Sequence, residues 1–248
     1  MSMTGLAQWL ESPQGRYVMA WEQACCDRLV ADIFGYNAVL VGGVDVDLLR
    51  QNRMPFRFRC AEGGTVAVMA EALALPFASA SVDLVVLPHV LEFSPNPHRV
   101  LREVERVLVP EGSVIVLGFN PLSSWGLRRL AGRGKGPFPW SGRYLSVGRL
   151  KDWLALLGFE AGETEFGCHV PPVQQQKWLD RWCPLDRAAR RWWPFLGGVY
   201  ALQGIKRVAG MRLILPAWRD RRAEAKALSP LAQRRGKTAQ RNKEMNHG

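Results

Sequence analysis

The chain has 248 residues, of which 48% are hydrophobic, and this is enough to build one full α/β core with additional elements. It contains no uncharged apolar run of about 18 residues, and residues 1–10 lack the basic start, apolar middle and cleavage site of a signal peptide. These features argue against a transmembrane or secreted protein, so we expect one main domain and a cytoplasmic location.

The net charge of +11 is unevenly distributed along the chain. Residues 217–248 hold nine Lys or Arg and three acids, so this segment contributes six of the eleven positive charges. It has almost no apolar residue after Leu231, and burial could not offset the entropy lost on ordering it. We predict a disordered basic tail at 217–248, which either only solubilises the protein or contacts RNA or an anionic membrane surface.

The cysteines are odd in number and form no C-x-x-C pair. A disulfide framework or a zinc site is therefore not expected, and we interpret these cysteines as reduced packing residues. They are Cys25, Cys26, Cys60, Cys168 and Cys183.

Near the N-terminus, apolar residues recur every four positions. This spacing predicts a helix that buries one face against the rest of the fold and ends near Gly35. We therefore interpret residues 1–36 as a helical N-terminal addition. The apolar stripe consists of Tyr17, Trp21, Cys25, Leu29 and Ile33.

Three short strands are predicted next, at residues 38–41, 56–61 and 66–70. The first is apolar throughout, and the second alternates Phe with Arg. The connection between these two strands contains only about a dozen residues.

Residues 81–119 predict a right-handed βαβ crossover. Leu84–Leu87 and Val114–Leu117 are apolar on both faces, as are strands inside a parallel sheet that helices cover. The helix between them should begin with Asn96 as N-cap and Pro97 as its first residue. Pro110–Gly112 is expected to end that helix.

The segment from Asn120 to Arg143 contains five basic residues and no acid. Its Gly-Arg-Gly-Lys-Gly-Pro run is typical of a flexible loop. Arg128 and Arg129 either form a merely solvated surface or attract an anionic substrate or partner. Ser146 then predicts the N-cap of a helix that ends at Gly158.

After a strand at 159–166 and before a last strand at 199–207, tryptophan alternates with basic residues. Such a segment suits stacking on nucleic-acid bases, a lipid interface, or a helix that simply covers the sheet edge, and all three remain open. We name residues 173–198 the Trp/Arg-rich lid. Its aromatic and basic residues include Lys177, Trp178, Arg181, Trp182, Arg187, Arg190, Arg191, Trp192 and Trp193.

One continuous stretch, LALPFASASVDLVVLPHVLEFSPNPHRVLREVERVLVPEGSVIVLGF, carries a family resemblance. It resembles the fourth strand, following helix and fifth strand of class I S-adenosylmethionine-dependent methyltransferases, in the branch that includes the ubiquinone methylases. Within that branch, WLESPQGRYVMAWEQ and GFNPLSSWGLRRL are similar to the uncharacterised proteobacterial YafS-type proteins. The resemblance covers about Asn37–Arg207.

This resemblance implies a Rossmann-like α/β fold at residues 37–211, with a mostly parallel seven-stranded sheet and helices on both faces. It also implies S-adenosylmethionine as cofactor and methyl transfer to an unidentified acceptor. The basic loop would favour an anionic acceptor. A contrasting hypothesis is a non-catalytic, methyltransferase-like module that binds RNA or a protein partner through its basic surface.

The family's glycine loop after the first strand is degenerate here. Gly42 is retained and Gly43 takes a variable position, whereas Val44 and Val46 stand where further glycines belong, and Leu40 replaces the usual acid. Glycines in this loop let the backbone approach the methionine end of the cofactor. The two valines should narrow that approach or push the loop outward.

Four acids are candidates for cofactor contacts. By resemblance, Glu62 would accept hydrogen bonds from the ribose hydroxyls and Glu71 from the adenine amino group, followed by Ala72 and Leu73 at the ring. Asp45 or Asp47 could supply a displaced carboxylate for the ammonium group, or mark a solvated helix start. Glu62 and Glu71 can equally be surface acids of turns.

At the end of the fourth strand, Leu87 and Pro88 should pass the methionine part of the cofactor. His89 follows them and is the candidate general base, because its pKa lies near working pH and ligands bind at the carboxyl ends of parallel strands. A structural histidine at the strand end is the alternative.

Overall fold

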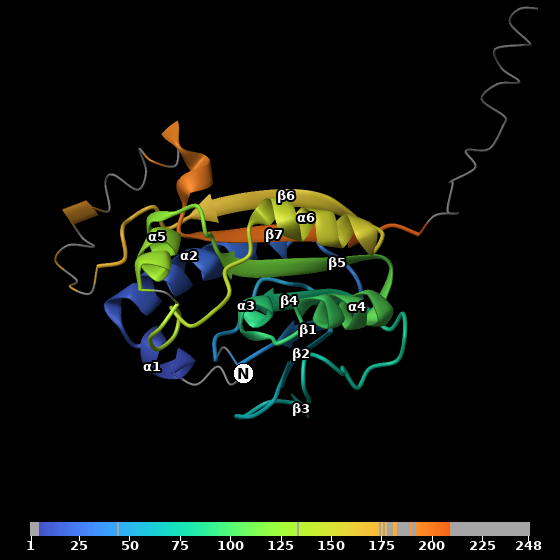
Figure 1. Ribbon diagram of the computed structural model, residues 1–248. Coiled ribbons are helices and arrows are strands. Elements are labelled where there is room, and N and C mark those ends of the chain that lie inside the picture. Colours follow the sequence, from blue (N-terminus) through green and yellow to red (C-terminus); the bar gives the residue numbers. More distant parts are fainter. Residues whose placement is uncertain are drawn as a thin grey trace, which may run out of the picture. The chain divides into compact units, whose positions relative to one another are not determined.

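The computed structural model describes residues 5–43, 45–132, 134–173, 175, 177, 181–182, 189 and 192–208 (Figure 1). Its helices are α1 (Leu6–Leu10), α2 (Pro13–Leu29), α3 (Val90–Phe93), α4 (Pro97–Val107), α5 (Ser124–Ala131), α6 (Val147–Leu156) and the short 3-10 helix η1 (Pro194–Leu196). Its strands are β1 (Asn37–Val41), β2 (Phe56–Ala61), β3 (Val68–Met69), β4 (Val82–Pro88), β5 (Leu108–Phe119), β6 (Phe159–Gly167) and β7 (Val199–Lys206). Among these described helices, none is long and apolar enough to cross a membrane. The predicted disordered tail and half of the Trp/Arg-rich lid, including Trp178, Cys183 and Arg187, lie outside the described residues.

A seven-stranded sheet in the order β3-β2-β1-β4-β5-β7-β6 forms the centre of the fold. The first five strands run parallel to one another, and β7 lies antiparallel between β5 and β6. The predicted Rossmann-like, mostly parallel sheet is therefore confirmed. Because the chain reverses its direction of winding between β1 and β4, the carboxyl ends of these two strands form the switch point of the sheet.

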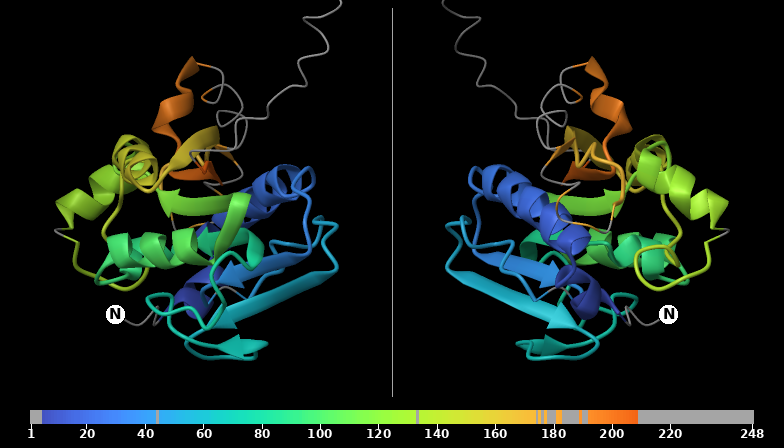
Figure 2. Two further views of the ribbon diagram at one scale, coloured as in Figure 1. Left: turned by 90° about the vertical axis from the view of Figure 1, so that its right-hand side faces the viewer. Right: turned by 90° about the vertical axis from the view of Figure 1, so that its left-hand side faces the viewer.

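Helices cover both faces of the sheet (Figure 2). Leu40 and Leu84 belong to a core shared with α1, α2 and α5, whereas Val39 and Val85 belong to a second core shared with α4 and α6. Strand residues of alternating direction thus supply both layers. The helices of the N-terminal segment are part of the first core, to which α2 contributes the buried Cys25.

The connection between β1 and β2 has no helix in its described residues. Asn52, which is 3% exposed, donates to the carbonyl oxygens of Val30 and Ile33 at 2.8 and 3.0 Å and accepts from the Met54 N–H at 3.0 Å. Arg57 of β2 donates to the carbonyl of Asn52 at 2.7 Å. Side chains therefore satisfy the backbone groups that a helix would otherwise pair.

One predicted helix end is wrong. The first helix stops at Leu29, well before Gly35, because the carbonyls of the following turn bond to Asn52 and cannot continue the helix. Gly35 has a different role, since a Cβ at this position would lie 2.4 Å from the side chain of Asp83. Asp83 in turn accepts the N–H groups of Tyr36 and Asn37, both at 2.9 Å, and so fixes the start of β1.

The N-cap Asn96 is as expected, and α4 ends at Val107, shortly before the stop residues Pro110 and Gly112. These two residues lie inside β5, because the chain becomes extended at Leu108. The register between β4 and β5 shifts just after the Leu108 pair, and such an irregularity accommodates a proline in a strand. The remaining strands and α6 with its N-cap Ser146 match the predictions closely, although β3 is shorter and α5 was not predicted.

Asn52 offers a direct test of this account of the β1–β2 connection. Replacing it in Asn52→Ala removes three hydrogen bonds, among them the one donated to the half-buried carbonyl of Ile33, so we expect the free energy of unfolding to fall by about 1–3 kcal/mol. The neighbouring exposed residue provides the control, since Gln51→Ala should change stability by less than about 0.5 kcal/mol. Urea denaturation of the two variants would contradict the account if they were equally stable.

Candidate functional site

Four of the predicted site residues follow four neighbouring strands at one edge of the sheet. Gly42 follows β1, Glu62 follows β2, Glu71 comes two residues after β3, and His89 follows β4. These strands are parallel and in register, so their carboxyl ends meet at this edge. Ligands of open α/β sheets bind at such an edge, next to the switch point.

The turn after β1 requires glycine at its first position. Gly42 has φ of 126°, in a region that side chains disfavour, and a Cβ there would lie 2.9 Å from Cγ2 of Val90. The adjacent Gly43 is exposed. Val44 lies outside the described residues, whereas Val46 is half-buried against the first core.

The two aspartates of this turn have partners within the protein. Asp45 accepts a hydrogen bond from Arg59 of β2 at 2.5 Å, and the Asp47 carboxylate accepts the N–H of Leu49 at 3.0 Å. Each carboxylate therefore already stabilises the irregular connection. A role for either one toward a cofactor ammonium group stays a prediction.

Glu62 and Glu71 are both exposed at the ends of their strands. Neither side chain has a hydrogen bond or ion pair with any residue that the structure describes. Both carboxylates thus remain available to donors from outside the protein. Carboxylates suit paired hydroxyl or amino donors because they only accept hydrogen bonds when ionised.

The loop after β3 is held against α4 by one arginine. Arg106 donates to the carbonyl oxygens of Leu75 and Phe77, both at 2.9 Å. Ala72 and Leu73 are half-buried and pack against the second core. The backbone around Glu71 is therefore held by packing and by Arg106, while the Glu71 side chain is exposed.

His89 lies in the interior, below the edge at which it was predicted to act. It is 1% exposed, and both ring nitrogens are engaged: Nε2 lies 2.7 Å from Oε1 of Glu22 in α2, and Nδ1 lies 2.8 Å from Oε2 of Glu92 in α3. Glu92 also accepts the backbone N–H of Phe119. A catalytic role for His89 stays a prediction, and it would require one of these bonds to open.

The two carboxylates decide the charge of this histidine. Burial alone would lower the pKa of His89, but Glu22 and Glu92 together raise it to about 10. The ring is then an imidazolium that donates to a carboxylate on each side. Burial also raises the pKa of Glu92, although its bonds to His89 and Phe119 act in the opposite direction.

Aromatic side chains close the space around His89. Phe119 stacks on the imidazole with ring centroids 4.4 Å apart, and Phe138 meets the imidazole edge-on at 6.2 Å. Trp9 of α1 contacts the ring of Phe138 at 5.0 Å, and Phe93 stacks on Phe138 at 4.8 Å. The preceding strand residues Leu87 and Pro88, predicted to pass the cofactor, are also buried.

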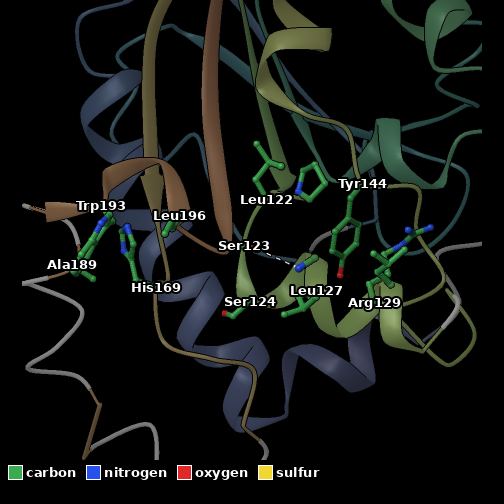
Figure 3. A pocket seen from close by; sticks show the side chains of 13 residues that line it. Leu122, Ser123, Ser124, Leu127, Arg129, Tyr144, His169, Ala189, Trp193 and Leu196 are labelled. Atoms are coloured by element: carbon green, nitrogen blue, oxygen red, sulfur yellow. Dashed lines mark hydrogen bonds between the residues drawn. The ribbon is translucent and has the colours of Figure 1, made fainter.

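A pocket of about 640 Å³ lies beyond β5, between α5 and the region of η1 (Figure 3). One side of the pocket is lined by Leu122, Leu127 and Leu130, and the other side by His169, Trp193 and Leu196. Tyr144 and Arg129 close one end of the pocket in the figure. The ring of Tyr144 stacks on Phe119 at 5.1 Å, so this end is the one directed toward His89.

Several residues of this edge were missed by the sequence analysis. The contact between Glu92 and His89 was not predicted, although residues three apart at the start of a helix can face each other. Glu22 lies beside an apolar stripe, and nothing in the sequence indicates that it faces a histidine 67 residues away. The pocket depends on α5, which was treated as part of a loop.

Comparison with known proteins relates this edge to one family. Residues 24–116 match the family described as "Methyltransferase domain". The uncharacterized protein YafS of Escherichia coli strain K12 is 45% identical over 100 residues, which are 40% of this chain and 42% of YafS, so the chain spans less than half of that relative's length.

Two solved structures illustrate the likeness of the fold. A putative methyltransferase from Haloferax volcanii, in complex with the Trm112 methyltransferase activator, has a TM-score of 0.58 at 14% identity, covering 83% of this chain and 97% of that one. A SAM-dependent methyltransferase from Archaeoglobus fulgidus has a TM-score of 0.53 at 17% identity, covering 74% and 92%.

The buried charge of His89 predicts a pH-dependent stability. Because its folded pKa of about 10 exceeds the ordinary value of 6.5, its stabilising contribution is complete below pH 6.5 and is lost as the pH rises to 10. We expect the free energy of unfolding to fall more steeply over this range in the wild type than in His89→Gln. His98→Gln, which alters an exposed histidine, should retain the wild-type slope. Urea denaturation at several pH values measures all three, and equal slopes for wild type and His89→Gln would disprove the charged state.

Proposed function

We propose, from the premise that residues 24–116 contain a methyltransferase domain within a Rossmann-like methyltransferase fold, that the protein transfers a methyl group from S-adenosylmethionine to an acceptor. The observation that carries this proposal is the set of strand ends at one edge of the sheet. Gly42, Glu62, Glu71 and His89 follow β1, β2, β3 and β4 in the arrangement that the family resemblance implies.

The residues at this edge fit the cofactor best at its nucleoside end. The free carboxylates of Glu62 and Glu71 suit the ribose hydroxyls and the adenine amino group. Ala72 and Leu73 supply an apolar surface next to the ring, as cofactor pockets commonly do. Gly42, with its left-handed backbone, and Gly43 would pass the methionine end.

When bound, the cofactor supplies a methyl group that its sulfonium already activates. The protein has then to align the acceptor with that methyl group and to exclude water. The aromatic side chains around His89 already exclude water from the end of β4. An acceptor that carries a proton on its nucleophile also needs a base, and His89 is the proposed group, once its imidazolium has passed a ring proton to Glu22 or Glu92.

Calorimetric titration with S-adenosylmethionine and with its demethylated product tests the proposal. Glu71→Ala should weaken binding of both by about 1–3 kcal/mol, the effect of losing a charged hydrogen-bond partner. Glu163→Ala, which removes an exposed carboxylate from β6, is the matched control and should bind as the wild type does. If millimolar ligand produces neither a heat of binding nor a thermal shift, the proposal is refuted.

A second function, a non-catalytic module that binds RNA or a protein through its basic surface, is favoured by one observation. Where the methionine end of the cofactor would lie, Val90 is close to Gly42. Trp9 and Phe138 cover the space near His89. The similar Haloferax volcanii protein forms a complex with an activator, which supports considering a protein partner here as well.

Salt dependence tests the basic surface. If Arg128, Arg129 and the tail contact RNA, the affinity for tRNA should fall steeply as the salt concentration rises. Deleting residues 217–248 should then remove most of this binding if the tail carries it, and little if the arginines do. No binding of tRNA at low ionic strength would exclude RNA as the partner of this basic surface.

A further inference from the structure

The pocket beside α5 is apolar and free of negative charge. Among the described residues that line it there are leucine, tryptophan and tyrosine side chains and the basic Arg129, but no Asp or Glu. Its volume of about 640 Å³ lies within the range of small-molecule sites, which is roughly 300–1,000 Å³. An apolar ligand of substantial size therefore fits it.

Exposed apolar side chains continue from the pocket onto the surface. Leu122, Leu127 and Leu130 are 72%, 67% and 70% exposed on one side, and Trp193 and Phe195 are 63% and 71% exposed on the other. Single exposed leucines need no explanation, but a group that borders an apolar pocket marks a binding surface.

The arginines of α5 make this surface unusual. Arg128 donates to the carbonyl of Pro172 and lies over the ring of Trp140, and Arg129 donates to the carbonyl of Gly142. The guanidinium groups thus bond back to the protein, while Leu127 and Leu130 on either side of them in the sequence remain exposed. A helix that only needed to be solvated would have the opposite arrangement.

One end of the pocket is polar and directed toward the predicted reaction centre. The hydroxyl of Tyr144 is buried and has no hydrogen-bond partner among the described residues. Arg129 lies over the Tyr144 ring, 5.2 Å from its centroid, and has further N–H donors beyond the one that Gly142 accepts. A buried donor without a partner is costly, so a polar ligand atom at this end would be stabilising.

We propose that this pocket binds the apolar chain of an anionic amphiphile, with the charged head at the end formed by Tyr144 and Arg129. The chain lies along Leu122, Leu127 and Leu196, and the exposed leucines of α5 extend the contact outward. The positive segment from Asn120 to Arg143, which contains no acid, supplies the charge complementarity. That this amphiphile is the methyl acceptor rests on the proposed function, whereas its binding does not.

Binding of cis-parinaric acid, a fluorescent anionic fatty acid, to the full chain below the concentration at which the acid aggregates tests the proposal. We expect saturable binding of one molecule per chain. The double variant Leu127→Ser/Leu130→Ser should weaken it by about tenfold or more, since two apolar contacts are lost. Leu156→Ser is the matched control, because Leu156 is 84% exposed on α6 and does not line the pocket. Absent binding, or equal losses in both variants, would overturn the proposal.

The charged head is tested separately with the methyl ester of the same acid. The ester should bind several-fold more weakly to the wild type, and Tyr144→Phe should weaken the acid but leave the ester nearly unchanged. Equal affinities of the acid and the ester would overturn the placement of an anionic head at this end.

Vesicles of phosphatidylglycerol distinguish a membrane lipid from a free amphiphile as the source of the chain. Recruitment that Leu127→Ser/Leu130→Ser reduces, and Leu156→Ser does not, supports a membrane lipid; probe binding without such recruitment supports a free amphiphile.

Titration with S-adenosylmethionine keeps the two proposals distinct. A variant that loses the fatty acid but still binds the cofactor separates the pocket from the cofactor edge, and fatty-acid binding by a protein without cofactor affinity would retain this inference and refute the proposed function.

Discussion

The bridge from Glu22 through His89 to Glu92 joins three parts of the fold that are distant in sequence. Glu22 belongs to α2, His89 follows β4, and Glu92 accepts the last N–H of β5, at Phe119. All three side chains are buried, so no water can replace a lost partner. Removing one member of such a group leaves an uncompensated charge in the interior, which is far more costly than losing a surface ion pair. The position of α2 on the sheet therefore depends on this bridge.

The same bridge constrains any chemistry at the end of β4. The left-handed backbone of His89, with φ of 55°, is uncommon for a residue with a side chain, and it directs the ring inward between the two acids. Phe119 covers one face of that ring and is itself covered by Tyr144, at the polar end of the pocket beside α5. An acceptor that approaches from this pocket meets Tyr144 and Phe119 before His89. Phe119 thus lies between His89 and the polar end of the pocket.

The sequence predicted the strands well because their signal is local. Runs such as Leu84–Leu87 are apolar on both faces only in a covered parallel sheet, and each run found in this way is part of an observed strand. The order of strand ends placed Gly42, Glu62, Glu71 and His89 at one edge without any knowledge of their distances. The burial of His89 was not predictable, because it depends on Glu22 of a separate helix, and residue spacing says nothing about which acid a helix turns toward a given strand.

The two halves of the sheet differ in how deeply their strands are buried. β4, β5 and β7 are buried along most of their length, whereas β2 begins with exposed residues and β3 consists of two residues, of which Met69 is 71% exposed. The connection after β1 depends on Asn52 and on arginines of β2 where a helix would give continuous packing. Elements with few buried contacts open at low free-energy cost. The half of the sheet that holds Glu62 and Glu71 is therefore the one that a bound nucleoside would stabilise most, because a ligand that binds only the folded form adds its binding free energy to stability.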